Sequence, residues 1–238
     1  MTTGTLYLLP VPLGATPAEA VIPAPTLDTA RQLQHFVVEN AKTARAMLKL
    51  MQHPIPLREL DLQELNEHTP ADAVSALLAP LRAGKDLGLM SEAGCPAVAD
   101  PGSLLVALAH AEGIRVAPLV GPSSLLLALM ASGLNGQNFA FHGYLPAREP
   151  ERSQTLRHLE ATSRKSGGVQ LFIETPYRNA ALFDSILACG HPASRLCIAM
   201  ALTTTDEWIC TRSLAQWKAA ARPAFDKQPT VFLLQASR

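Results

Sequence analysis

The chain has 238 residues, of which 48% are hydrophobic and 17% are charged, so it can build a sizeable core in one large or two small domains. This composition excludes a largely disordered chain. The 20 basic and 20 acidic residues give a formal net charge of zero. That balance argues against a protein that holds nucleic acid mainly through its phosphates, although a local basic face remains compatible with it.

Cysteine spacing and the N-terminus limit the class of protein further. The four cysteines form no CxxC pair, and the seven histidines show no metal-ligand spacing. We therefore expect reduced thiols, no disulfide and no bound metal. The N-terminus lacks the basic region and long apolar core of a signal peptide, and no apolar run is long enough to cross a bilayer. These features predict a soluble cytoplasmic protein with no membrane-embedded part.

The first half of the chain alternates short apolar runs with helical patterns. The predicted strands are residues 5–9, 35–38, 87–90 and 114–120. The predicted helices are residues 25–33, 41–52, 70–81 and 101–112, the third with Thr69 as N-cap and the fourth ended by Gly113. Such alternation predicts a wound, mostly parallel sheet.

The order of predicted strands and helices changes after residue 120. Residues 121–133 begin as a loop and continue as a very apolar helix. Further strands are predicted at 139–141, 169–173, 195–199, 207–212 and 230–234, with helices at 151–164 and 177–187. The sequence thus predicts an α/β protein of two α/β domains. Residues 1–120 form a wound, mostly parallel sheet, and residues 121–238 form a mixed, more antiparallel sheet with helices.

Three loops rich in glycine and proline follow predicted parallel strands of the first domain. They are residues 10–14, 92–102 and 121–124. Ligands of open α/β sheets bind at the carboxyl ends of the strands, and glycine and proline let main chain approach a ligand closely. No loop is a GxGxxG or a Walker P-loop, and each could be an ordinary strand–helix turn. Together they predict a small-molecule site without naming its ligand.

Five stretches in order carry a family resemblance. They are GTLYLLPVPLG (4–14), SEAGCPAVADPG (91–102), VGPSSLLLALMASGL (120–134), FAFHGYLP (139–146) and FIETPYR (172–178). Together they resemble the motifs of the tetrapyrrole-methylase-type S-adenosylmethionine (SAM) methyltransferases. The branch they resemble most is the ribosomal small-subunit RNA methyltransferase I family, which methylates a cytidine 2'-hydroxyl. The resemblance runs from residue 4 to about residue 234.

The resemblance implies a two-domain enzyme, usually a homodimer, with SAM in the cleft between its domains. The cofactor contacts it implies are Pro10, Pro12, Gly94, Cys95, Pro96, Val98, Ala99, Ser123, Ser124, Tyr144, Leu145, Ala199, Met200 and Pro229. The residues expected to contact the substrate are Glu39, Lys42, Glu174 and Arg178. The partner would be ribosomal RNA or the small ribosomal subunit.

The substrate motifs depart from the family pattern more than the cofactor motifs do. The acidic–basic signature EDTRHTR reads ENAKTAR at residues 39–45, so an Asp is replaced by Asn40 and an Arg by Lys42. Lysine lacks the planar fork of arginine. ARELTK reads AMALTT at residues 199–204, and Tyr177 stands where His is common. These changes leave the methyl acceptor open.

Methyl transfer from a sulfonium needs alignment above all, and a weakly nucleophilic sugar hydroxyl also benefits from a general base. The acids near the predicted site are Glu39, Glu92, Asp100 and Glu174. For Asp100, which precedes Pro101, capping the following helix is the favoured role. Arg178 either holds a phosphate or carboxylate, or pairs with a nearby acid. The sequence does not identify the base.

For two further features, a structural role is favoured over a catalytic or RNA-binding role. Cys95 has no activating partner in the sequence, so we expect it to form part of the cofactor wall. The basic residues within 148–165 are diluted by acids, which favours a solvated helix face over an RNA contact.

Three functions remain open at this point. The motifs favour an RNA 2'-O-methyltransferase. The zero net charge and the altered ENAKTAR signature favour a methyltransferase for a small molecule such as a tetrapyrrole precursor. The weakened substrate motifs also permit a protein that binds SAM without turnover and acts by binding a partner.

Overall fold

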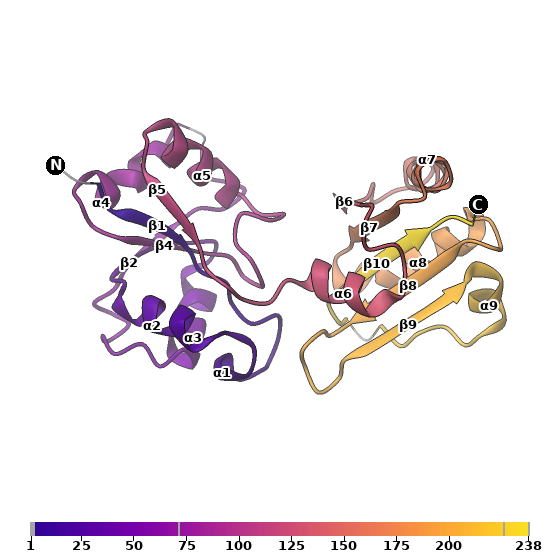
Figure 1. Cartoon of the computed structure of the whole chain (residues 1–238), viewed down its shortest axis with the longest axis horizontal. Coiled ribbons are helices and arrows are strands. Elements are labelled where there is room, and N and C mark those ends of the chain that lie inside the picture. The colour runs from indigo at the N-terminus through magenta and orange to yellow at the C-terminus, as the bar shows by residue number, and fades with distance from the viewer. Residues whose placement is uncertain (1–2, 71, 226, 238) are drawn as a thin grey trace. The chain divides into compact units, whose positions relative to one another are not determined.

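A computed structural model describes residues 3–70, 72–225 and 227–237 of the chain (Figure 1). The chain divides into two compact units, Met1–Ser123 and Ser124–Arg238. The first unit contains a five-stranded parallel sheet and the second a five-stranded mixed sheet. This confirms the predicted α/β class with two different sheets.

The first unit is a parallel sheet covered by helices on both faces. Its strands, in the spatial order β3-β2-β4-β1-β5, are β1 (Thr5–Leu8), β2 (His35–Val38), β3 (Asp61–Glu64), β4 (Leu87–Met90) and β5 (Arg115–Pro118). Its helices are α1 (Ala18–Val21), α2 (Ala24–Gln32), α3 (Ala41–Leu50), the 3-10 helix η1 (Val74–Leu78), α4 (Ala79–Arg82) and α5 (Gly102–Ala111). Helices α2 and α3 lie on one face of the sheet, and α4 and α5 lie on the other (Figure 1).

Alternation of side chains along the strands explains this three-layer arrangement. Phe36 and Val38 of β2 pack in the core that contains the apolar faces of α2 and α3. Val37, between them, packs in the opposite core with residues of η1, α4 and α5. Successive strand residues point to opposite faces, so a strand that is apolar throughout is buried on both sides.

The structure differs from the prediction at β3 and at residues 70–81. Strand β3 has the polar sequence DLQE, which gave no apolar signal, and it forms an edge strand in register with β2. Residues 70–81 form no continuous helix but the two short pieces η1 and α4, with Pro80 in the first turn of α4. A proline inside a longer helix would remove a backbone hydrogen bond. Thr69 Oγ1 accepts from Asn66 N at 3.0 Å, and Ala71 lies outside the described residues.

The second unit is a mixed sheet with helices on both faces. Its strands, in the spatial order β6-β7-β10-β8-β9, are β6 (Phe139–Tyr144), β7 (Val169–Ile173), β8 (Arg195–Met200), β9 (Trp208–Ser213) and β10 (Thr230–Gln235). Its helices are α6 (Ser124–Ser132), α7 (Glu151–Ser166), η2 (Pro176–Arg178), α8 (Asn179–Cys189) and α9 (Leu214–Ala219). Strands β6 and β7 are parallel, and the other three pairings are antiparallel.

The core of this unit is aromatic. Phe172 and Phe232 stack with ring centroids 6.0 Å apart, and Trp217 of α9 meets Phe183 edge-on at 5.7 Å. Helix α9 was not predicted, although its start carries a recognisable signal. Ser213 accepts from Gln216 N while the Gln216 side chain accepts from Ser213 N, which is a capping box.

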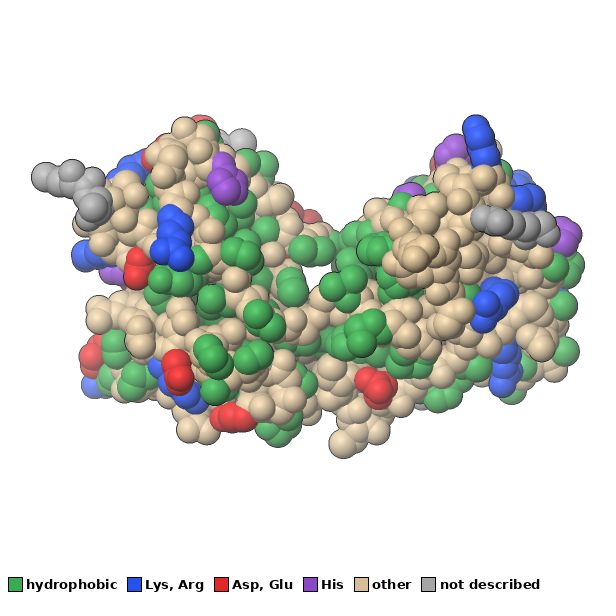
Figure 2. All heavy atoms as spheres, in the orientation of Figure 1, with side chains coloured by type: hydrophobic (Ala, Val, Ile, Leu, Met, Phe, Trp, Pro, Cys, Tyr) green, Lys and Arg blue, Asp and Glu red, His purple; other side chains and the backbone are tan. Residues whose placement is uncertain are grey.

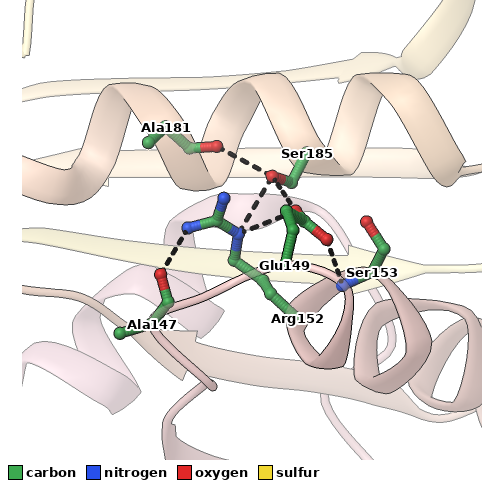
Figure 3. A network of polar contacts seen from close by, with 6 residues as sticks. All are labelled: Ala147, Glu149, Arg152, Ser153, Ala181 and Ser185. Carbon is green, nitrogen blue, oxygen red and sulfur yellow. Dashed lines mark hydrogen bonds and ion pairs between the residues drawn. The ribbon is translucent and has the colours of Figure 1, made fainter.

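A polar network joins the start of α7 to α8 (Figure 3). Arg152 is 8% exposed, and its Nε donates to Glu149 Oε1 at 3.1 Å and to Ser185 Oγ at 2.9 Å. Ser185 Oγ in turn donates to Glu149 Oε1 at 2.8 Å. Arg152 is therefore engaged inside the unit, so it cannot belong to a solvated basic face of α7.

The network makes acid stability depend on Glu149. Hydrogen bonds from Ser153 and Ser185, with Arg152 adding to them, lower the pKa of Glu149 from 4.5 to about 2. A depressed carboxyl pKa stabilises the fold above pH 4.5, and this contribution is lost as the pH falls towards about 2. We expect Glu149→Gln to flatten this part of the stability curve, measured by urea unfolding from pH 6 to about 2. Glu151→Gln, at an exposed position of the same helix, should keep the wild-type slope.

Candidate functional site

Three loops meet at the carboxyl edge of the first sheet, beyond the adjacent strands β4, β1 and β5. Val11 and Gly94 exchange two backbone hydrogen bonds, of 3.0 and 3.1 Å, across the first two loops. Cys95 Sγ lies 3.5 Å from the Pro122 carbonyl oxygen and joins the second loop to the third. The loops that the sequence singled out separately are therefore one interlocked structure made largely of main chain.

Two glycines make this close packing possible. An added Cβ at Gly121 would lie 2.3 Å from Cγ of Pro10, which is far inside contact distance. Gly94 has φ +71°, and an added Cβ there would lie 3.1 Å from Cδ2 of Leu13. Glycine is required at these positions for the close approach and for the left-handed backbone.

Asp100 holds the second loop in shape. Its Oδ1 accepts from Ala97 N at 3.0 Å and from Gly102 N at 2.7 Å, at the start of α5. Ala97 and Ala99 adopt φ of 65° and 62°, an unusual conformation for residues with a Cβ. Burial raises the pKa of Asp100, and its Oδ2 is buried without a hydrogen-bond partner among the described residues. These bonds show Asp100 in the structural role that the sequence favoured.

The implied cofactor residues of the first unit differ in accessibility. Pro10, Pro12, Gly94 and Pro96 are buried, Cys95 is half-buried, and Ala99 and Val98 are exposed, with Val98 at 49%. Burial raises the pKa of the Cys95 thiol, which makes it a poorer nucleophile at neutral pH. Ser123 follows Pro122 in the third loop, and Ser124 is the first residue of α6.

Acidic side chains gather at the adjoining edge, where β2 ends. Glu39 Oε2 accepts from Glu92 N at 3.2 Å. Burial raises the pKa of Glu39, and the nearby carboxylates of Glu92, Asp100 and Glu67 raise it further. A raised pKa makes this carboxylate a stronger base than an ordinary glutamate.

Asn40 and Lys42 of the ENAKTAR stretch differ from the family signature, and one of them has a clear structural role. Asn40 caps α3, because its Oδ1 accepts from Lys42 N at 2.9 Å and from Thr43 N at 3.3 Å. Asparagine and aspartate cap helices about equally well, so this departure preserves the local structure. The Lys42 side chain is exposed.

The cofactor and substrate residues that the family resemblance implies in the second unit lie at one edge of its sheet. Strand β10 is antiparallel to β7 and β8, so its start meets the ends of β6, β7 and β8. Tyr144, Glu174, Met200 and Pro229 lie at this edge, and Ala201 N donates to the Pro229 carbonyl at 2.9 Å. Tyr144 is 56% exposed. Leu145, Ala199 and Met200 are buried at 5%, 1% and 6%, so contact with a ligand would fall mainly to their main chain.

Glu174 and Arg178 form a paired unit at the same edge. The Glu174 side chain is 0% exposed, and its Oε1 accepts from Arg178 Nη2 at 2.6 Å and Nε at 2.9 Å. Its Oε2 is buried with no hydrogen-bond partner in the described part of the chain. Arg178 is 35% exposed and stacks on Tyr177 with its Cζ 5.7 Å from the ring centroid. Glu174 therefore orients Arg178, while Arg178 and Tyr177 are the accessible members.

Asn179 is a residue at this edge that the sequence did not indicate. It is fully buried, and its Nδ2 donates to the Gln228 carbonyl at 2.9 Å and to Thr230 Oγ1 at 3.0 Å. It thereby ties the start of α8 to the residues around Pro229. No local sequence signal distinguishes it from an ordinary helix-start asparagine.

Two other kinds of feature are absent from the described residues. Within residues 3–70, 72–225 and 227–237, no group of three or more His, Cys, Asp or Glu side chains is arranged to hold a metal ion. Over the same residues, no helix combines the length and apolarity needed to cross a membrane.

Curated relatives include several proteins named ribosomal RNA small subunit methyltransferase I. The one from Escherichia coli O157:H7 is 33% identical over 206 residues, covering 87% of this chain and 68% of that protein. The one from Mesorhizobium japonicum is 34% identical over 219 residues, covering 91% of this chain and 70% of that protein. The match thus extends over both units but leaves part of each relative uncovered.

Solved structures share the fold at much lower identity. The methyltransferase CobJ matches with a TM-score of 0.65 and 19% identity, covering 100% of this chain and 95% of that one. Diphthine synthase matches with a TM-score of 0.68 and 17% identity, covering 98% of this chain and 90% of that one. The family model of tetrapyrrole (corrin/porphyrin) methylases matches residues 11–217. The chain therefore belongs to the tetrapyrrole methylase family of SAM-dependent methyltransferases.

Proposed function

We propose that the chain transfers the methyl group of SAM to a cytidine 2'-hydroxyl in the RNA of the small ribosomal subunit. The interlocked loops at the edge of β4, β1 and β5 are the observation that carries the cofactor part of this proposal. The names of relatives that are 31–34% identical over about nine-tenths of the chain support small-subunit ribosomal RNA as the acceptor. The cytidine 2'-hydroxyl within it is what the motif resemblance implies.

The first unit's loops fit a cofactor held by main chain. Gly94 and Gly121 pack too closely for side chains, so the loop backbone itself forms the surface. Pro10, Pro12 and the segment around Cys95 would hold SAM in the first unit. The family resemblance adds Tyr144 and Pro229 as cofactor residues of the second unit. SAM supplies an electrophilic methyl group on sulfur.

The protein's own residues must orient the acceptor and remove its proton. We assign the base to Glu39, because burial and the neighbouring carboxylates raise its pKa. The accessible pair Tyr177 and Arg178 would hold the RNA, with the ring against a base and the guanidinium against a phosphate. Glu174 acts through Arg178 and is a positioning residue.

The Glu39 assignment predicts a specific pH dependence. Because the base must be ionised, the methylation rate should rise with pH through the raised pKa of Glu39 and then level off. Glu39→Gln should lower the rate by about 10²-fold and remove this rising limb. Single-turnover methylation at saturating SAM, measured from pH 5 to 8, checks it. An unchanged rising limb in the variant would assign the proton to another group.

Methyl uptake from radiolabelled SAM tests the proposed function. The acceptors are small ribosomal subunits lacking the modification, the naked RNA of that subunit, and a tetrapyrrole precursor. Incorporation at a cytidine ribose of the RNA is the expected result. Saturable SAM binding by calorimetry with no uptake into any acceptor would instead favour the catalytically idle alternative.

A small-molecule acceptor is the second candidate. Lys42 replaces an arginine of the RNA-branch signature, and the net charge is zero. Figure 2 shows Lys and Arg side chains dispersed singly over the displayed face of each unit. Uptake into the tetrapyrrole precursor alone would establish this candidate and contradict the ribosomal one.

We also propose that the protein works as a homodimer in the cytoplasm. Leu126 and Met130 of α6 are 53% and 79% exposed, and Phe139 on the edge strand β6 is 44% exposed. Figure 2 shows hydrophobic side chains gathered over α6. Such exposure favours association. Light scattering after gel filtration should give twice the mass of 25.4 kDa, and Met130→Lys should weaken association.

A further inference from the structure

The second unit contains a pocket outside the residues assigned to SAM and its acceptor, apart from Met200. Its volume is about 870 Å³, and it lies between β9, α9 and the segment that follows α9. Ala220, Ala221 and Ala224 form part of its wall. Their small side chains leave the space open beside two tryptophans.

The tryptophans differ in accessibility. Trp217 is 2% exposed, and its Nε1 donates to the Leu196 carbonyl at 2.9 Å, which fixes the ring. Trp208 is 37% exposed, with its centroid 6.2 Å from that of Trp217. Trp208 therefore offers the pocket an aromatic surface on a rigid support.

Arg212 adds a positive charge to the same pocket. Its Cζ lies 4.9 Å from the Trp217 ring centroid, so the guanidinium is held over the indole. Within the described residues it has no acidic partner, whereas Arg222, also in the pocket, pairs with Asp184. Stacking orients the Arg212 guanidinium while leaving its N–H donors for an anionic group.

The alternation of side chains along β9 places Trp208 and Arg212 on the same side of the sheet. Thr211 donates to the Ser132 carbonyl of α6 at 2.7 Å, so its neighbour Arg212 faces the opposite side, towards α9. Trp208 pairs with Met200, at the sheet edge that carries Tyr144 and Glu174. The pocket thus opens beside the edge where we place the RNA.

We infer that this pocket binds one nucleotide of an unpaired RNA strand, with the base against Trp208 and the phosphate on Arg212. Aromatic stacking and an arginine contact are how proteins hold unpaired nucleotides. Asp206 also lines the pocket, and a carboxylate accepts from the exocyclic amine of cytosine. The choice of RNA as the source of the nucleotide rests on the proposed function.

Tryptophan fluorescence tests the inference, because the chain has two tryptophans and only Trp208 is accessible. The protein is titrated, without SAM, with tetracytidylate, cytidine 5'-monophosphate, cytidine and inorganic phosphate. Tetracytidylate and the monophosphate should quench saturably, cytidine should bind about tenfold more weakly, and phosphate alone should not quench.

Matched variants identify the pocket. Arg212→Gln should weaken tetracytidylate binding about tenfold, because a charge-assisted contact is lost. Lys218→Gln removes an exposed charge from the same region, on α9, and should change nothing. Ala221→Phe should fill the pocket and abolish quenching without touching a charged group, and thermal melting confirms that each variant is folded.

Two results would overturn the inference. The first is no quenching by tetracytidylate; if the monophosphate still quenches, the ligand is a free nucleotide. The second is quenching that survives both Arg212→Gln and Ala221→Phe. Methylation of ribosomal subunits by a protein that fails this titration overturns the pocket only. Binding through Arg212 without any methyl transfer overturns the proposed function only.

Discussion

Gly94→Val should weaken SAM binding strongly while leaving the second unit folded. Gly94 has φ +71°, and an added Cβ would press against Leu13 at 3.1 Å and the Pro122 carbonyl oxygen at 3.4 Å. A β-branched side chain disfavours this backbone, so the loop must shift, at a cost of about 2 kcal/mol in unfolding free energy. We expect at least a ~tenfold loss of SAM affinity from so large a displacement of the loop, measured by calorimetric titration.

Gly113→Ala is a control that has the cost of a side chain at positive φ without the steric clash expected at Gly94. Gly113 has φ +67°, similar to Gly94, but an added Cβ there would meet no atom within 4 Å. It should cost about 1 kcal/mol of stability and leave SAM affinity unchanged. Unaltered affinity in Gly94→Val would mean that the cofactor does not use the interlocked loops.

Arg178→Ala should reduce both methylation and stability. It leaves the carboxylate of Glu174, which is 0% exposed, without its main cationic partner. Removing one member of such an ion pair lowers the free energy of unfolding by several kcal/mol when both members are buried. We expect a loss of about 2 kcal/mol here, because Arg178 is 35% exposed. We also expect a ~tenfold or greater loss in kcat/KM towards RNA, from the lost phosphate contact.

The double variant Glu174→Gln with Arg178→Ala distinguishes these two effects. Neutralising the buried acid should recover part of the stability, since the isolated charge is gone. Methylation should stay low, because the accessible guanidinium is still missing. Urea unfolding and single-turnover methylation of the wild type, Glu174→Gln, Arg178→Ala and the double variant provide the cycle. Recovery of methylation together with stability would show that Arg178 has a structural role only.

The regular elements were predictable because burial dictates their composition. Strand β4 and residues 36–38 of β2 are apolar, and both strands were predicted with their observed bounds. Helix α5 was predicted to within one residue at each end, because Pro101 and Gly113 bracket it. Strand β3 was missed because an edge strand can be polar, and α9 because six residues are too few for a helical period.

The site was predictable only where main chain forms it. Glycine and proline in the loops predict a small-molecule site at this edge, and the structure shows these loops bonded to one another. The pairing of Glu174 with Arg178 and the burial of Asn179 depend on how η2 and α8 return to the sheet. The pocket beside Trp208 depends on contacts between β9 and a segment beyond α9. A linear sequence does not reveal such distant contacts.

The cap at Asn40 bears on how a polyanion approaches this edge. Glu39, Glu92, Asp100 and Glu67 already concentrate negative charge there, and burial together with the carboxylates of the other three raises the pKa of Glu39. An aspartate at position 40 would cap α3 equally well but would repel each incoming phosphate. Asparagine keeps the helix start and removes that repulsion. The change that departs from the family signature would thus lower the electrostatic barrier to the proposed RNA acceptor at low ionic strength, where screening is weakest.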